Sequence, residues 1–71
     1  MSEKEIEFTV FCIENVAEKI HKSGLEAYLL LKKANLIKDY IVPSYEVLHT
    51  QSKNYIVDDI ISVMKKKGLV V

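Results

Sequence analysis

The sequence predicts an all-α fold, a compact bundle of about four short helices that form a single helical domain over residues 1–71. Apolar residues recur three and four positions apart in separate segments, which is the spacing of one face of an α-helix. Serine, asparagine and glycine residues stand between these segments, where helices commonly begin and end. With only two Gly and one Pro, the chain lacks the turn residues of an all-β fold. The short runs 40–42 and 69–71 could pair only weakly as strands.

The first helix is expected to run from about Ser2 or Glu3 to about Lys22. Ser2 and Glu5 form a capping-box pattern, and His21 falls at the exposed end of the helix. The main apolar face is expected to comprise Ile6, Val10, Ile13, Ala17 and Ile20, and it is widened by Phe8, Phe11, Cys12 and Val16. Because this helix is apolar around more than half its circumference, we expect contacts on two sides, with its own domain or with a partner.

The second helix is expected to begin at Ser23, which forms another capping-box pattern with Glu26, and to run for about ten residues. Asn35 can adopt the left-handed conformation that ends a helix. Residues 36–38 are then expected to form a connection.

The third helix has two candidate starts. Asp39 can cap its beginning, with Pro43 in the first turn or just after it. Alternatively the helix begins at Ser44, and residues 40–42 are an extended lead-in, because proline disfavours helix in the residue before it. The helix is expected to end near residues 49–50. Its apolar side is expected to comprise Tyr45, Val47 and Leu48.

The last helix is expected to begin near Ser52 or Asn54 and to end at Gly68, a residue type that favours helix stops. The apolar face of this helix is expected to comprise Ile56, Val57, Ile60, Ile61 and Met64. Residues 69–71 form an apolar tail that either packs back on the bundle or frays.

Charge and cysteine content narrow the function classes. The chain has ten acidic and ten basic residues, and every basic residue is Lys. Zero net charge and the absence of Arg count against a nucleic-acid partner. Cys12 is the single Cys and lies in an apolar run, so we expect a small buried side chain rather than a disulfide or a zinc ligand.

The motif content points away from catalysis. The sequence contains no Gly-rich phosphate loop, no HExxH and no GxSxG motif. Asp58 and Asp59 point about 100° apart on a helix, so we expect them to be solvated rather than to form an acid pair. We therefore expect no enzyme activity, no catalytic residue, no cofactor, no metal and no small-molecule substrate.

A cytoplasmic protein without a membrane partner is expected. The N-terminus is acidic and lacks the hydrophobic core of a signal peptide. No apolar run approaches the about 20 residues that a membrane span requires.

Polar and aromatic residues cluster at the end of the third helix. One interpretation is structural: these side chains satisfy loose helix-end carbonyls and cap the next helix. The other is a small binding surface, since Tyr keeps its hydroxyl wet while burying ring area at interfaces. The residues of this candidate surface are Tyr45, His49, Thr50, Gln51 and Tyr55.

The element Leu48-His49-Thr50, followed by Tyr55-Ile56-Val57-Asp58-Asp59, resembles a family of small bacterial proteins, domain of unknown function 3791. The acidic-then-apolar opening, residues 3–8, and the segment 29–33 fit as well, so the resemblance covers nearly the whole chain. It implies a short stand-alone protein whose gene tends to lie near a larger, ADP-ribosyltransferase-like protein. The implied role is a companion or regulator of that neighbour, of antitoxin or immunity type.

The sequence therefore favours a non-catalytic helical module for protein–protein interaction, with another bacterial protein or a second copy as the partner. Its contact surface would use the broad apolar face of the first helix or the region of residues 40–55. The alternative is a helix-turn-helix DNA-binding regulator, drawn from the short helices between Ser23 and His49. The recognition helix of that alternative would carry Glu46 and no Lys or Arg, which counts against it. The identity of the partner stays open.

Overall fold

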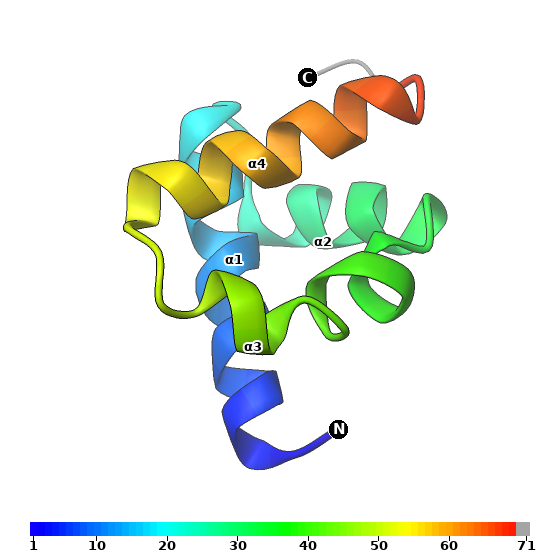
Figure 1. The fold of residues 1–71 in the computed structure, drawn as a ribbon. Coiled ribbons are helices and arrows are strands. Elements are labelled where there is room, and N and C mark those ends of the chain that lie inside the picture. The colour runs from blue at the N-terminus through cyan, green and yellow to red at the C-terminus, as the bar shows by residue number, and fades with distance from the viewer. Residues whose placement is uncertain (70–71) are drawn as a thin grey trace.

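A computed structural model describes residues 1–69 and confirms the all-α fold. The elements are α1 (Glu3–Lys19), α2 (Gly24–Lys33), the π-helical turn η1 (Ile37–Ile41), α3 (Tyr45–Leu48) and α4 (Lys53–Lys66). α1 is the central element and contacts α2, η1 and α4. In Figure 1 the first turns of α1 extend beyond the other helices. α3 lies beside α1 at the point where α1 enters the bundle.

Serine side chains begin three of the helices, as predicted. Ser2 and Ser23 each form a complete capping box, in which the Ser hydroxyl accepts the N–H of a Glu three residues later and that Glu carboxylate accepts the Ser N–H. Ser52 caps α4 by accepting the N–H of Tyr55 at 3.2 Å. Such a cap contributes about 1 kcal/mol, because it satisfies backbone donors that have no partner inside the helix.

Residues in the left-handed conformation end three of the helices. Asn35 (φ 58°) and Gly68 (φ 83°) do so as predicted. α1 instead ends at Lys19, short of the expected Lys22, because His21 adopts a φ of 59°. The N–H groups of residues 21 and 22 then donate to the carbonyls of residues 18 and 17, which is a Schellman motif.

The buried face of α1 differs from the predicted one. Its buried residues are Phe8, Thr9, Cys12, Val16 and Ala17. Ile6 and Val10, which were expected on the main face, are 49% and 46% exposed. About half of each side chain therefore remains open to solvent, on the side of α1 away from the core. The predicted two-sided contact is therefore only partly satisfied within the chain.

The segment between α2 and α3 corrects two predictions. Residues 37–41 form a π-helical turn, in which the N–H of Val42 donates to the carbonyl of Ile37 at 3.0 Å. Asp39 therefore lies inside a turn rather than capping a helix, and residues 40–42 are not extended. Leu36 and Ile41 are both buried, although residues five apart point about 140° apart on an α-helix. The wider turn brings both side chains to the core.

α3 begins at Tyr45, close to the alternative start at Ser44, although the Ser44 side chain makes no capping hydrogen bond. This single-turn helix buries Leu48 but leaves Val47 69% exposed, so the prediction that Val47 belongs to its apolar side is wrong.

One core joins all the elements. Its buried members are Phe8, Cys12, Val16, Leu31, Leu36, Ile41, Leu48, Ile56, Val57, Ile60 and Met64. The predicted face of α4 is confirmed, with Ile61 partly buried at its edge. Leu69 packs against this core, and residues 70–71 of the predicted tail lie outside the described residues. Over residues 1–69, no helix has the length and apolar character to cross a membrane.

Candidate interaction surface

Aromatic side chains connect α1 to α3. The ring of Phe8 meets the ring of Tyr45 edge to face, with centroids 5.4 Å apart. Tyr45 stacks in turn on the His49 imidazole at 4.4 Å, and Phe8 lies 6.5 Å from Phe11 in a near-parallel arrangement. Aromatic pairs in such geometries contribute about 0.5–1.5 kcal/mol beyond the area they bury. The four rings therefore form a continuous row across the α1–α3 contact.

This row lines an open groove, which we call the aromatic groove. Its volume is about 440 Å³. The lining residues are Lys4, Glu7, Phe8, Phe11, Tyr45, His49, Gln51 and Ile56. Aromatic rings and the Ile56 side chain supply the apolar part of the wall, and Lys4, Glu7, His49 and Gln51 supply the polar part. Binding sites combine apolar walls with polar groups that fix the orientation of the ligand.

The single turn of α3 positions the two rings on its side of the groove. Tyr45 and His49 are four residues apart, so their side chains lie on the same side of the helix. The His49 ring is also held by the backbone one turn earlier, because its Nδ1 lies 2.6 Å from the Tyr45 carbonyl oxygen. Nδ1 donates in this arrangement, which leaves Nε2 as the nitrogen available to an incoming group.

The structure divides the five predicted site residues. Tyr45, His49 and Gln51 line the aromatic groove. Thr50 donates its hydroxyl to the Val47 carbonyl at 3.2 Å, which is the helix-end role of the structural interpretation. Tyr55 is 54% exposed on α4 and does not line the groove.

The α1 side of the groove is missing from the predicted site. Lys4, Glu7, Phe8 and Phe11 line it. Phe8 and Phe11 are apolar positions in a helix that is apolar on several sides, and the sequence gives no signal that they face α3. Only the chain path through η1 brings residues 45–51 back against them.

A polar contact outside the groove links η1 to α4. The Tyr40 hydroxyl donates a hydrogen bond to the Asp59 carboxylate. This corrects the prediction that Asp59 is only a solvated charge. Burial, the hydrogen bond to Asp59 and the negative charge of Asp59 together raise the pKa of Tyr40 to about 12, with burial the largest cause. The neutral phenol is the form that the fold holds.

Tyr40→Phe is expected to lower the free energy of unfolding by about 1 kcal/mol at neutral pH, because Asp59 loses its donor. It should also weaken the alkaline loss of stability. The raised pKa of Tyr40 contributes stability that is complete below pH 10.0 and is lost as the pH rises toward 12. Urea unfolding between neutral pH and the alkaline range measures both effects. Tyr28→Phe, at an exposed tyrosine, is the matched control, and an equal alkaline loss in both variants would contradict the assignment.

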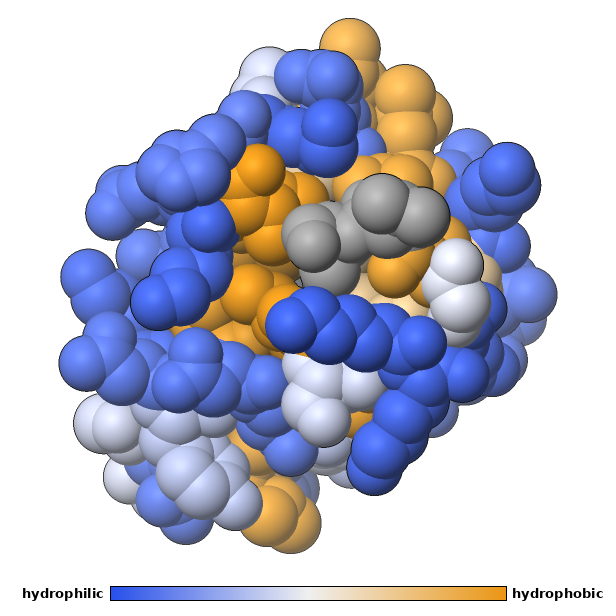
Figure 2. Space-filling view, turned by 90° about the horizontal axis from the view of Figure 1, so that it is seen from above, coloured by the Kyte–Doolittle hydropathy of each residue, from blue (hydrophilic) through white to orange (hydrophobic). Residues whose placement is uncertain are grey.

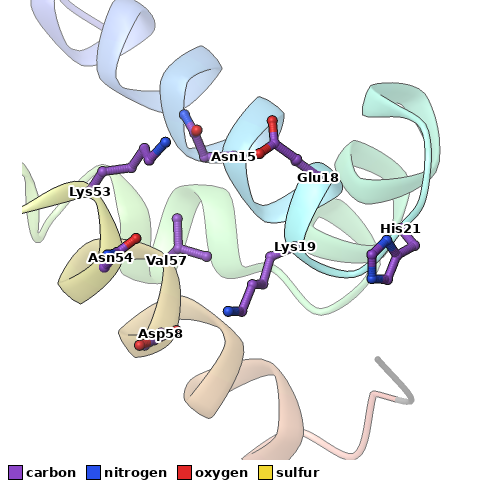
Figure 3. A pocket seen from close by; sticks show the side chains of 8 residues that line it. All are labelled: Asn15, Glu18, Lys19, His21, Lys53, Asn54, Val57 and Asp58. Carbon is purple, nitrogen blue, oxygen red and sulfur yellow. The ribbon is translucent and has the colours of Figure 1, made fainter.

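A more polar groove lies between the end of α1 and the start of α4 (Figure 3). Its volume is about 600 Å³. The lining residues are Asn15, Glu18, Lys19, His21, Lys53, Asn54, Val57 and Asp58. The Lys19 and Lys53 side chains extend into the space between the two helices, and carboxylates border it (Figure 3). Every titratable side chain in this lining is exposed, so the groove lacks the desolvated acid or base that catalytic pockets use.

The remaining chemical groups offer no ligand set. Across residues 1–69, no three His, Cys, Asp or Glu side chains are grouped so that they could hold a metal ion. Cys12 is fully buried, as predicted, and burial raises the pKa of its thiol to about 12. A thiol in that state is a packing group, because the thiolate is the reactive form.

Comparison with known proteins gives one match. The family model described as a protein of unknown function, DUF3791, matches residues 7–67. No curated protein and no solved structure matches the chain. The matched segment includes Glu7, Phe8 and Phe11 on one side of the aromatic groove and Tyr45, His49 and Gln51 on the other. The resemblance seen in residues 48–50 and 55–59 is confirmed, and the chain belongs to the DUF3791 family.

Proposed function

We propose that the protein is a non-catalytic interaction module that binds a protein partner through the aromatic groove. The observation that carries this proposal is the row of aromatic rings from Phe11 to His49, which lines an open groove between α1 and α3 and has exposed rings at both ends. Phe11 is 37% exposed although it lies beside Phe8, and His49 is exposed although it stacks on Tyr45. Large rings left at the surface of so small a chain mark a contact site.

The groove favours an apolar side chain with polar neighbours as its occupant. An aliphatic or aromatic side chain of the partner would fill the hollow between Phe11 and Tyr45. Lys4, Glu7 and His49 Nε2 would then bind polar groups at its margin, which fixes orientation more than it adds affinity.

The family suggests which partner to examine first. We propose that the module acts in the cytoplasm as the companion or regulator of the ADP-ribosyltransferase-like protein encoded near genes of this kind, in an antitoxin or immunity role. The absence of a catalytic constellation in either groove fits a regulator that acts by binding.

Co-expression with the neighbouring ADP-ribosyltransferase-like protein tests the proposal. The tagged chain should capture it, and Phe11→Ser or His49→Ala should each weaken binding about tenfold or more, as truncation of interface aromatic residues typically does. Val47→Ser is the matched control, because Val47 is 69% exposed on α3 but does not line the groove. Circular dichroism is the check that each variant is folded. If the control lost capture equally, or if both groove variants retained it, the aromatic groove would not be the contact site.

The helix-turn-helix alternative has no comparable support. α3 is a single turn of four residues, Tyr45–Leu48, and its exposed charged residue is Glu46. Recognition helices present several donors along a major groove about 12 Å wide. A salt-dependent shift of duplex DNA by the purified chain would revive this alternative.

A further inference from the structure

We propose that the chain also binds a second copy of itself head to tail, with the outward side of α2 in one copy against the exposed side of α1 in the next. The two surfaces are independent of the aromatic rings described above. They are called here the basic face of α2 and the acidic flank of α1.

The basic face is the side of α2 that points away from the core. Leu25 and Leu29 are one helical turn apart and are 67% and 52% exposed. Tyr28 borders them, with the Lys32 Nζ 5.8 Å from the centre of its ring. The exposed lysines around these apolar residues are Lys22, Lys32 and Lys33. An outward Leu pair bordered by lysines is an amphipathic surface that no other element within residues 1–69 covers.

Glu26 also lies on α2, but its carboxylate is occupied by the helix cap. It accepts the backbone N–H of Ser23 at 3.1 Å, and hydrogen bonds from Ser23 lower the pKa of this carboxyl. The carboxylate keeps its negative charge, but Lys22, Lys32 and Lys33 outnumber it, so this face presents a net positive charge to another molecule.

The acidic flank is the exposed side of α1 that carries Ile6 and Val10. Ile6 and Val10 are one turn apart and about half exposed. Glu3 precedes Ile6 by three residues and Glu14 follows Val10 by four, so both carboxylates are neighbours of the apolar pair on the helix surface. Both are exposed. The view from above (Figure 2) shows the end of the molecule opposite the N-terminus, where hydrophobic patches are likewise bordered by hydrophilic residues.

Charge complementarity selects the occupant of each surface. Both consist of an apolar pair spaced by four residues, which is the ridge that packs into the grooves of another helix. Pairing two basic faces would bring lysines against lysines, and pairing two acidic flanks would bring carboxylates against carboxylates. Pairing one of each matches opposite charges around buried aliphatic groups, and a second copy of this chain supplies both.

The size of the surfaces predicts weak association. A stable interface of standard size takes about 800 Å² from each partner. That would be about a sixth of the 4711 Å² surface of the chain, and each face here spans only about two turns. We therefore expect dissociation constants in roughly the micromolar range or weaker. Because the contact is head to tail, it builds rings or open chains rather than a two-fold dimer.

Light scattering coupled to size-exclusion chromatography tests the proposal with two one-sided variants. Val10→Glu disables the acidic flank, and Leu29→Lys disables the basic face. The average mass of the unmodified chain should rise above that of a monomer as concentration increases, and each variant alone should remain monomeric. An equimolar mixture of the two variants should form a heterodimer, because each retains the surface that the other has lost.

Two further variants should not affect self-association and serve as controls. Val47→Lys changes a valine that is even more exposed than Val10 and lies outside both surfaces, so it should leave self-association unchanged. His49→Ala should also leave it unchanged while weakening capture of the neighbouring protein, so failure of one proposal does not imply failure of the other. A monomer at every concentration, a mixture that stays monomeric, or self-association by either one-sided variant alone would overturn head-to-tail binding.

Discussion

Replacing Leu31 with Ala is expected to leave a large fraction of the molecules unfolded in the absence of denaturant. Leu31 is fully buried in α2 and belongs to the core that joins all the elements. Truncating a buried Leu lowers the free energy of unfolding by about 2–5 kcal/mol, since it removes buried apolar surface and leaves a cavity. A single core in a chain of this size supplies only about 3–5 kcal/mol in total.

The same substitution two residues earlier is the matched control. Leu29 is 52% exposed, so Leu29→Ala should change the free energy of unfolding by no more than about 0.5 kcal/mol. Urea unfolding at low protein concentration, followed by circular dichroism, measures both variants. Equal losses of stability in the two variants would show that α2 does not pack with the orientation described here.

Tyr45→Ala is expected to lower the free energy of unfolding by about 2 kcal/mol, because it removes a half-buried ring and both of its aromatic pairings. These are the edge-to-face contact with Phe8 and the stack on His49. Tyr45→Phe keeps the ring and should retain nearly all of the stability. The α1–α3 contact should therefore depend on the ring rather than on the hydroxyl.

Tyr55→Ala is the matched control for this prediction, since Tyr55 is 54% exposed and makes none of these ring contacts. It should change the free energy of unfolding by no more than about 0.5 kcal/mol. Thermal and urea unfolding of the three tyrosine variants provide the comparison. If Tyr55→Ala were the more damaging change, the assignment of Tyr45 to the groove wall would be wrong.

Local chemistry explains why the ends of most helices could be predicted. The capping role of a Ser and the left-handed conformation of Asn35 and Gly68 depend on neighbours only a few positions away along the chain. The local sequence pattern is therefore sufficient to predict these helix ends. His21 was missed as a left-handed residue because histidine adopts that conformation less often than glycine or asparagine. The buried face of α4 was predictable because that helix is apolar on one side only.

Long-range packing explains the errors. α1 is apolar on several sides, so its sequence alone could not decide between Ile6 and Val10 on one side and Phe8 and Cys12 on another. The choice depends on how far the other helices reach along α1. The π-helical turn at residues 37–41 depends likewise on the need to bury Leu36 and Ile41 together.

The candidate site was predictable on one side only. Tyr45, His49 and Gln51 stood out because polar and aromatic residues cluster there within a few positions. Their counterparts Phe8 and Phe11 lie more than thirty positions away along the chain, and the fold alone brings them together. Thr50 and Tyr55 share the sequence cluster with Tyr45, but they face elsewhere, so proximity in sequence overestimated the site.

Two-dimensional NMR of the isotope-labelled chain, titrated with the neighbouring ADP-ribosyltransferase-like protein, tests most directly whether the aromatic groove is the contact surface. We expect the largest changes in amide resonances at residues 4–11 and 45–51, which form the two sides of the aromatic groove. Changes confined to other surfaces, or an unchanged spectrum at saturating concentrations of the neighbour, would contradict this expectation.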